Sequence, residues 1–143
     1  MRVDFAFGAA DRVAQAARTT LRQATKGVRV FAYCTDTKRL GQFDQALWAV
    51  DDTAFVAHEM FNDRATPNLP VYLVDQAGWA FLPKAIKPED WLLNLDDECP
   101  PLFDGLRRVL EIVSNEDSDR QRARSRWRQY QQHGADLHAH KLA

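Results

Sequence analysis

The chain has 143 residues, of which 45% are hydrophobic and 27% are charged, and its formal net charge is −1. This length suits one globular domain with a hydrophobic core, so residues 1–143 are expected to form a single domain. No apolar run approaches the ~20 residues of a membrane span, and the first residues lack a signal-peptide pattern, which predicts a cytoplasmic protein with no membrane partner. A near-neutral charge argues against a surface that binds nucleic acid throughout, so any electrostatic partner must meet a local patch.

The first half of the chain alternates predicted strands and helices. Residues 2–7 and 28–34 are rich in β-formers, with an Ala-rich helix predicted over 9–26 between them. A second helix is expected from Thr35 or Asp36 to about Val50. Its core face carries Leu40, Phe43, Leu47 and Val50. This order predicts an α/β fold, with a Rossmann-like, mostly parallel sheet flanked by helices.

The second half of the chain begins with a turn-rich stretch over 62–70. Strands are predicted at 71–75 and 91–95, and residues 80–83 between them are a candidate hairpin strand. Apolar residues at helical spacing predict an amphipathic helix over 102–113. They are Leu102, Leu106, Val109, Leu110 and Val113. The last residues, 135–143, show no periodicity and are expected to form a loose tail.

Residues 114–134 predict a basic C-terminal helix. Ser114 is a suitable N-cap, and Gly134 follows the last expected helical residues. Two neighbouring stripes follow this helix, one with Arg120, Arg124, Trp127 and Arg128, the other with Arg122, Arg126 and Tyr130. Because so few of its residues are apolar, the helix should dock by a thin seam and leave most of its arginines in water.

Trp48 does not belong to the apolar face of the helix that carries it. At 100° per residue it lies well away from the centre of that face, so it is expected to point out of the core. Phe55 lies just beyond the same helix. Such a Trp either packs under a local loop or contributes to an interface, where Trp is enriched.

The sequence offers no pattern for catalysis, metal binding or cofactor binding. The first strand-to-helix turn has only Gly8 where a dinucleotide fingerprint needs three glycines, and there is no Walker A motif. The acidic trio 96–98 follows a strand, but no second carboxylate cluster or basic phosphate clamp accompanies it, which favours a structural turn over a magnesium site. His138 and His140 lack a third ligand at a fixed spacing. We therefore expect no catalytic residue, no cofactor and no metal.

Three stretches resemble the chi subunit family of bacterial DNA polymerase III, an accessory subunit of the clamp-loader complex. They are VDFAF at the start, FDQALW followed by DTAFVAH, and VLEIVSNEDSDRQRARSRWRQYQQHG near the C-terminus. The resemblance covers residues 3–58 and 100–138. It implies a catalytically inert α/β domain that binds two proteins. One is the single-stranded DNA-binding protein, held by an acidic C-terminal tail that ends in an apolar residue; the other is the psi subunit, which ties chi to the clamp loader.

The resemblance also implies which residues bind the tail. The matching positions are Val113 as part of an apolar floor, Arg124, Trp127 where a Tyr is usual, and Arg128. Gln131 departs from the pattern, because a further Arg is expected there. Guanidinium groups suit the aspartates of such a tail, and an aromatic wall suits its terminal side chain.

For the psi-facing surface the matching positions are Trp48 and Phe55. Two other functions stay open on the residues alone. One is direct binding of single-stranded nucleic acid, with bases stacked on Trp127 and Tyr130. The other is a nucleotide-dependent enzyme with its site near Gly8, which the missing glycines disfavour.

Overall fold

The computed structural model, which describes residues 1–50 and 56–142, is built on one parallel seven-stranded sheet in the order β3-β4-β2-β5-β6-β1-β7. The strands are β1 (Arg2–Ala9), β2 (Val30–Tyr33), β3 (His58–Met60), β4 (Val71–Val74), β5 (Trp91–Asn94), β6 (Arg108–Ser114) and β7 (Asp136–Lys141). The helices are α1 (Arg12–Thr25), α2 (Thr37–Val50), the short 3₁₀ helix η1 (Gly78–Phe81) and α3 (Asp117–Gln132). This architecture confirms the expected α/β, Rossmann-like parallel sheet flanked by helices.

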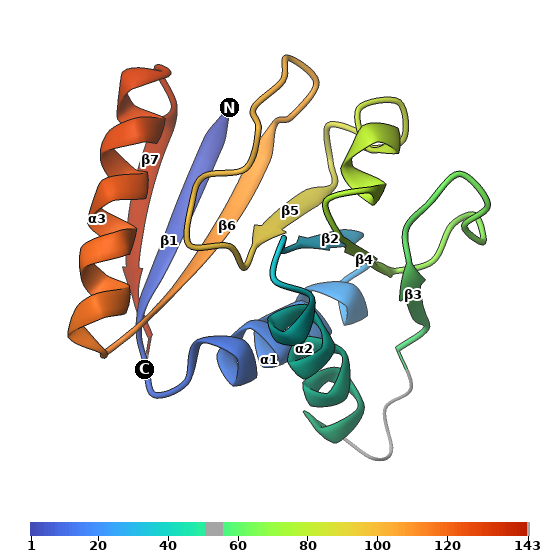
Figure 1. Cartoon of the computed structure of the whole chain (residues 1–143), viewed down its shortest axis with the longest axis horizontal. Helices are drawn as coiled ribbons and strands as arrows, with labels where there is room; N and C mark the ends of the chain where they lie inside the picture. The colour runs from blue at the N-terminus through green and yellow to red at the C-terminus, as the bar shows by residue number, and fades with distance from the viewer. Residues whose placement is uncertain (51–55, 143) are drawn as a thin grey trace.

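Helices cover both faces of the sheet. On one face, α1 and α2 pack their buried apolar residues against the strands, including Ala17, Phe43 and Leu47. On the other face, α3 and the segment that follows η1 bury Tyr130 and Leu82. Figure 1 shows α3 beside β7 and β1, whereas α1 and α2 lie together on the other side of the sheet. The C-terminal basic helix therefore lies at one end of the strand order, far from β3.

Aspartate side chains begin the first two helices. The Asp11 carboxylate accepts a hydrogen bond from the backbone N–H of Ala14 at 2.8 Å at the start of α1. Asp36 accepts in the same way from the backbone of Lys38 at 3.0 Å and of Arg39 at 3.2 Å. These bonds satisfy N–H groups that have no partner within a helix. Of the two N-caps proposed for α2 from the sequence, the structure uses Asp36.

The prediction of a helix over 102–113 is wrong, because residues 108–114 form strand β6. This strand lies between β5 and β1, and its residues from Val109 to Ser114 are buried. A strand covered on both faces needs apolar residues at successive positions rather than at alternate ones. Over a few residues, such a run contains the same spacings as the apolar face of a helix, so periodicity could not separate the two.

Two other segments also differ from their predicted secondary structure. Residues 136–141, expected within a loose tail over 135–143, form the edge strand β7, which pairs in parallel with β1. Its apolar content is low because one of its edges and much of its surface face solvent, which hid the strand pattern. Residues 80–83 were a candidate hairpin strand, but Gly78–Phe81 form the helical turn η1 instead.

The N-terminus of α3 also differs from its prediction, since Ser114 is the last residue of β6 and not an N-cap. Pairing with Ala9 holds Ser114 in the sheet, and the helix begins at Asp117 after the cap residue Glu116. The backbone N–H and hydroxyl of Ser114 instead donate to the carboxylate of Asp119, at 2.7 and 2.8 Å. Asp119 thus ties the first turn of α3 to the end of β6.

A buried carboxylate on β6 fixes the rest of α3 against the sheet. Glu111 is fully buried, and its Oε1 accepts from Nε of Arg126 at 3.0 Å. Its Oε2 accepts from the hydroxyl of Tyr130 at 2.7 Å and from Nδ2 of Asn94 at 2.8 Å. Arg126 is 1% exposed and also donates to the backbone carbonyl of Asp97 at 3.0 Å. The sequence predicted that most arginines of this helix lie in water, and Arg126 is the exception.

We predict that Arg126→Met lowers the free energy of unfolding by about 3 kcal/mol, because it removes a hydrogen-bonded charge from a buried carboxylate. Urea denaturation followed by circular dichroism measures this change. Arg128→Met is the matched control, since Arg128 lies on the same helix but is exposed, and it should change stability by less than about 0.5 kcal/mol. Equal denaturation midpoints for the two variants would show that the buried pair does not stabilise the fold.

Gly78 offers a second test, of the packing of η1 against the strands. A Cβ on Gly78 would lie 2.5 Å from the backbone oxygen of Phe61, so we expect Gly78→Ala to destabilise the protein by about 1–3 kcal/mol. Gly41 in α2 has no atom within 4 Å of an added Cβ, so Gly41→Ala should stabilise the protein by about 0.5–1 kcal/mol. Thermal denaturation of both variants measures the difference, and a neutral Gly78→Ala would contradict the close approach.

Candidate functional site

A groove of about 430 Å³ lies between α3 and the carboxyl ends of β1, β6 and β7. Its lining includes three of the four residues predicted to bind an acidic tail, Val113 from β6 and Arg124 and Trp127 from α3. Arg128 is not among the lining residues, and it lies exposed one turn further along α3. The structure therefore brings Val113, Arg124 and Trp127 together and leaves Arg128 at the side.

The floor and one wall of this groove are apolar. The Trp127 ring packs on Phe5 of β1, with ring centroids 5.1 Å apart, so its position is fixed by the sheet. Val113 and Ala123 are buried beneath the groove. Phe7 of β1 also lines it and keeps 40% of its surface exposed. The groove thus presents an accessible aromatic and aliphatic surface that a ligand could cover.

The charged side chains that line the groove are all basic. Arg120 and Arg124 come from α3, and Lys141 comes from the edge strand β7. Within the described ranges, no Asp or Glu side chain lines it. Since the whole chain has a formal net charge of −1, this is a local positive patch on a near-neutral protein.

The second stripe predicted on the same helix is divided between solvent and core. Arg122 is exposed, but Arg126 and Tyr130 face the sheet and are buried. Burial, together with the adjacent Glu111 carboxylate, raises the pKa of Tyr130 well above its usual value. Tyr130 is therefore a core residue, and it offers no ring on which a nucleic-acid base could stack.

A second hollow of about 410 Å³ lies at the opposite end of the strand order, between α2 and β3. Trp48 lines it and is 54% exposed, which confirms that this residue points out of the core. Its ring centroid is 4.8 Å from that of His58, whose Nε2 lies 2.6 Å from the carboxylate of Asp44. The nearby Met60 is 41% exposed. Phe55, the other residue predicted for this surface, lies outside the described residues.

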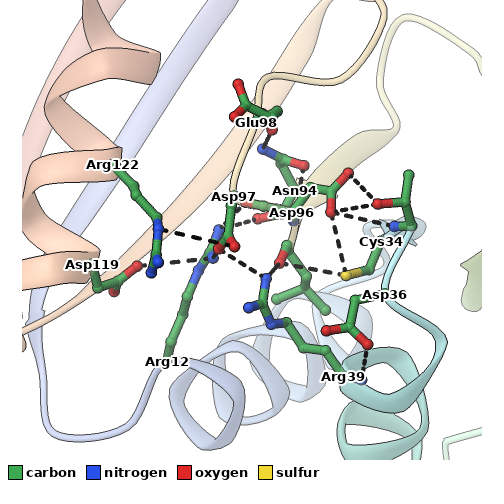
Figure 2. A network of polar contacts seen from close by, with 12 residues as sticks. Arg12, Cys34, Asp36, Arg39, Asn94, Asp96, Asp97, Glu98, Asp119 and Arg122 are labelled. Atoms are coloured by element: carbon green, nitrogen blue, oxygen red, sulfur yellow. Dashed lines mark hydrogen bonds and ion pairs between the residues drawn. The ribbon is translucent and has the colours of Figure 1, made fainter.

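The crevice above the carboxyl ends of β5 and β6, where parallel α/β sheets commonly bind ligands, contains the buried side chain of Arg12. Its guanidinium donates to the backbone carbonyls of Ile112 at 3.0 Å, Asn94 at 3.2 Å and Asp96 at 2.8 Å. Figure 2 shows Arg12, with Arg39 and Arg122, around this turn. Arg12 thus bonds the strand ends to α1, and it lines a hollow of about 290 Å³ at this edge of the sheet.

Two members of the acidic trio 96–98, Asp96 and Asp97, belong to the same network and have structural partners. Asp97 accepts from Arg39 at 3.1 Å, and Asp96 accepts from the Thr35 hydroxyl at 2.9 Å (Figure 2). Burial opposes ionisation of Asp97, but the hydrogen bond and charge of Arg39, together with Arg122 and Arg12, outweigh it and lower the pKa of the carboxyl. Within residues 1–50 and 56–142, no group of three or more His, Cys, Asp or Glu side chains is arranged to hold a metal.

The chain has two free cysteines, Cys34 and Cys99. Burial raises the pKa of each thiol to about 11, so both remain protonated and weakly nucleophilic at neutral pH. No helix in the part of the chain that the structure describes is long and apolar enough to cross a membrane.

Phe7 and Lys141 line the groove but were not identified from the sequence. Phe7 continues the alternation of Val3 and Phe5 in the first strand. Because alternate residues of a strand share one face, this pattern could have predicted that Phe7 lies on the same side of the sheet as Val3 and Phe5. Lys141 lies in the segment predicted as a loose tail, where the sequence showed no strand pattern. Its place in the groove follows from pairing with β1.

The chain matches the family described as DNA polymerase III chi subunit, HolC, over residues 1–138. It is 30% identical to the DNA polymerase III subunit chi of Pseudomonas aeruginosa, over 99% of this chain and 96% of that protein. It is 29% identical to the Escherichia coli (strain K12) protein of the same name, over 78% of this chain and 72% of the relative, and 23% identical to that of Haemophilus influenzae, over 78% and 74%. A match of this extent shows that the chain belongs to the DNA polymerase III chi subunit family, as the three sequence stretches indicated.

Proposed function

We propose that this member of the chi subunit family is a non-catalytic adaptor in DNA replication. It binds the acidic C-terminal tail of single-stranded DNA-binding protein in the groove beside α3, and it binds a psi-type subunit of the clamp loader at the α2–β3 surface. DNA is then reached only through the protein that coats it. We expect the adaptor to act in the cytoplasm, where bacterial DNA is replicated.

The observation that carries this proposal is the composition of the groove. The resemblance to the chi subunit family implies tail binding by Val113, Arg124 and Trp127, and these three residues line one groove together with two further cations. Guanidinium groups form short, charge-assisted hydrogen bonds with carboxylates, and the apolar floor suits a terminal apolar side chain. Because the arginines are exposed, such binding should be of moderate affinity and sensitive to salt.

The second surface supports the psi part of the proposal. Tryptophan is enriched at the centres of protein interfaces. Trp48 is exposed and lines a hollow together with the apolar residues Leu40 and Met60. Arg12 supports the absence of catalysis, because its buried guanidinium is bound to backbone carbonyls at the strand ends, where enzymes with parallel α/β sheets bind substrates. The protonated thiols agree with this, since neither cysteine is activated as a nucleophile.

We predict that Arg124→Ala weakens binding of the acidic tail peptide about tenfold, the effect of losing one charge-assisted hydrogen bond at a partly exposed site. Arg128→Ala should weaken it only about twofold, because Arg128 lies outside the groove lining. Fluorescence anisotropy with a labelled peptide at low and at physiological salt measures both effects. Arg22→Ala, an exposed arginine of α1, is the matched control and should bind like the wild type.

Two results would contradict the tail-binding proposal: no binding of the peptide at low salt, or unchanged binding in the variant that combines Arg124→Ala with Arg128→Ala. The same assay with a labelled single-stranded oligonucleotide separates the adaptor from a direct nucleic-acid binder. The adaptor should bind the oligonucleotide weakly or not at all, since Tyr130 is buried and offers no ring for base stacking, and the net charge of the chain is near neutral.

For the second surface, we predict that Trp48→Ala keeps the thermal midpoint within a few degrees of the wild type but strongly weakens binding of a psi subunit, about 20-fold or more. The reason is that Trp48 is 54% exposed in this structure, so its removal leaves no large internal cavity. Isothermal titration calorimetry with purified psi measures the affinity. Phe81→Ala removes a 42% exposed aromatic ring from η1 and serves as the control. A large loss of thermal stability in Trp48→Ala would show that Trp48 is a core residue after all.

A further inference from the structure

The groove beside α3 has a second wall, formed by the end of β1 and the edge strand β7. Phe7 and Lys141 are register partners in the parallel pairing of these strands, and the backbone N–H of Leu142 donates to the carbonyl of Phe7 at 2.9 Å. Both side chains line the same groove as Arg124 and Trp127. An exposed aromatic ring and an ammonium group therefore lie side by side, across the groove from the helix.

Strand alternation fixes the face on which Lys141 lies. Leu137, four residues earlier on β7, is partly buried and packs against the core beneath α3, so Lys141 lies on that same face of the sheet. His140 points to the opposite face, where its Nε2 lies 2.8 Å from the carboxylate of Asp4. His140 and Lys141 are neighbours in β7 but lie on opposite faces of the sheet. Of these two residues, Lys141 lines the groove.

We propose that Phe7 and Lys141 are specificity-determining residues for an acidic peptide that ends in an apolar side chain. The ammonium of Lys141 pairs with a peptide carboxylate from the strand side, while Arg120 and Arg124 bind carboxylates from the helix side. The ring of Phe7 contacts the terminal apolar side chain together with Trp127. This inference rests on the proposed function, since it extends the same groove and the same class of ligand.

Charge and exposure at the groove argue for this second wall. Side chains of an extended peptide alternate between two directions, so a single basic wall could neutralise only part of a run of aspartates. Among the described residues that line the groove, cations lie on both walls and there is no carboxylate. This distribution of charge matches a peptide that carries acidic side chains along both of its sides. Phe7 is 40% exposed, so a ligand can bury further area of its ring, whereas the Val113 floor is already almost fully buried.

The test uses the whole chain and two labelled peptides with a free carboxyl terminus, one acidic with a terminal Phe and one with a terminal Ala. Lys141→Ala and Lys141→Gln should each weaken binding of the first peptide about threefold at low salt, and the difference should shrink at high salt. Phe7→Ala should weaken the Phe-terminated peptide about fivefold and the Ala-terminated peptide less than about twofold. His140→Ala, on the same strand but the opposite face, is the control and should bind like the wild type.

The outcomes separate this inference from the function on which it rests. If the wild type does not bind either peptide, the proposed function itself is wrong. If the wild type binds and Arg124→Ala weakens binding, but Lys141→Ala and Phe7→Ala bind like the wild type, then only the second wall is wrong. An equal loss for both peptides in Phe7→Ala would also overturn the assignment of Phe7 to the terminal side chain.

Discussion

The buried carboxylate of Glu111 is the constraint on which the position of helix α3 depends. It lies in β6, in the interior of the sheet, and its two oxygens accept hydrogen bonds from Arg126, Tyr130 and Asn94. A buried charge without such partners would cost several kcal/mol, so the rotation of α3 that brings Arg126 and Tyr130 inward is strongly favoured. At 100° per residue, the same rotation turns Arg124 toward the groove. An interior interaction therefore sets the geometry of a surface site.

At the carboxyl ends of β5 and β6, where parallel α/β sheets commonly bind ligands, charged side chains form structural contacts in this protein. Arg12 bonds backbone carbonyls at the ends of β5 and β6, and nearby acidic groups such as Asp97 are paired with further arginines. The two hollows that carry the proposed binding residues lie instead at the two ends of the strand order, one beside β3 and one beside β7 (Figure 1). The described residues that line these two hollows do not overlap.

The fold class and most elements of the first half of the chain could be predicted, because each depends on local patterns. The capping side chain of Asp36 and the apolar face of α2 are spaced as an isolated helix requires. That same periodicity placed Trp48 outside the core, where the structure has it. The strand β6 could not be predicted in this way, since its apolar run reflects burial by neighbours on both sides, which a single sequence does not reveal.

By itself, the sequence determined the α/β class, the basic C-terminal helix, the outward position of Trp48 and the resemblance to the chi subunit family. Only the tertiary structure decided which residues of that helix face solvent, since the burial of Arg126 follows from its partner on β6 and not from its neighbours in the chain. It also decided that residues 136–141 form a strand, because β1 supplies the hydrogen bonds that hold β7. The groove combines residues from opposite ends of the chain, such as Phe7 and Lys141, and contacts over that separation exist only after folding.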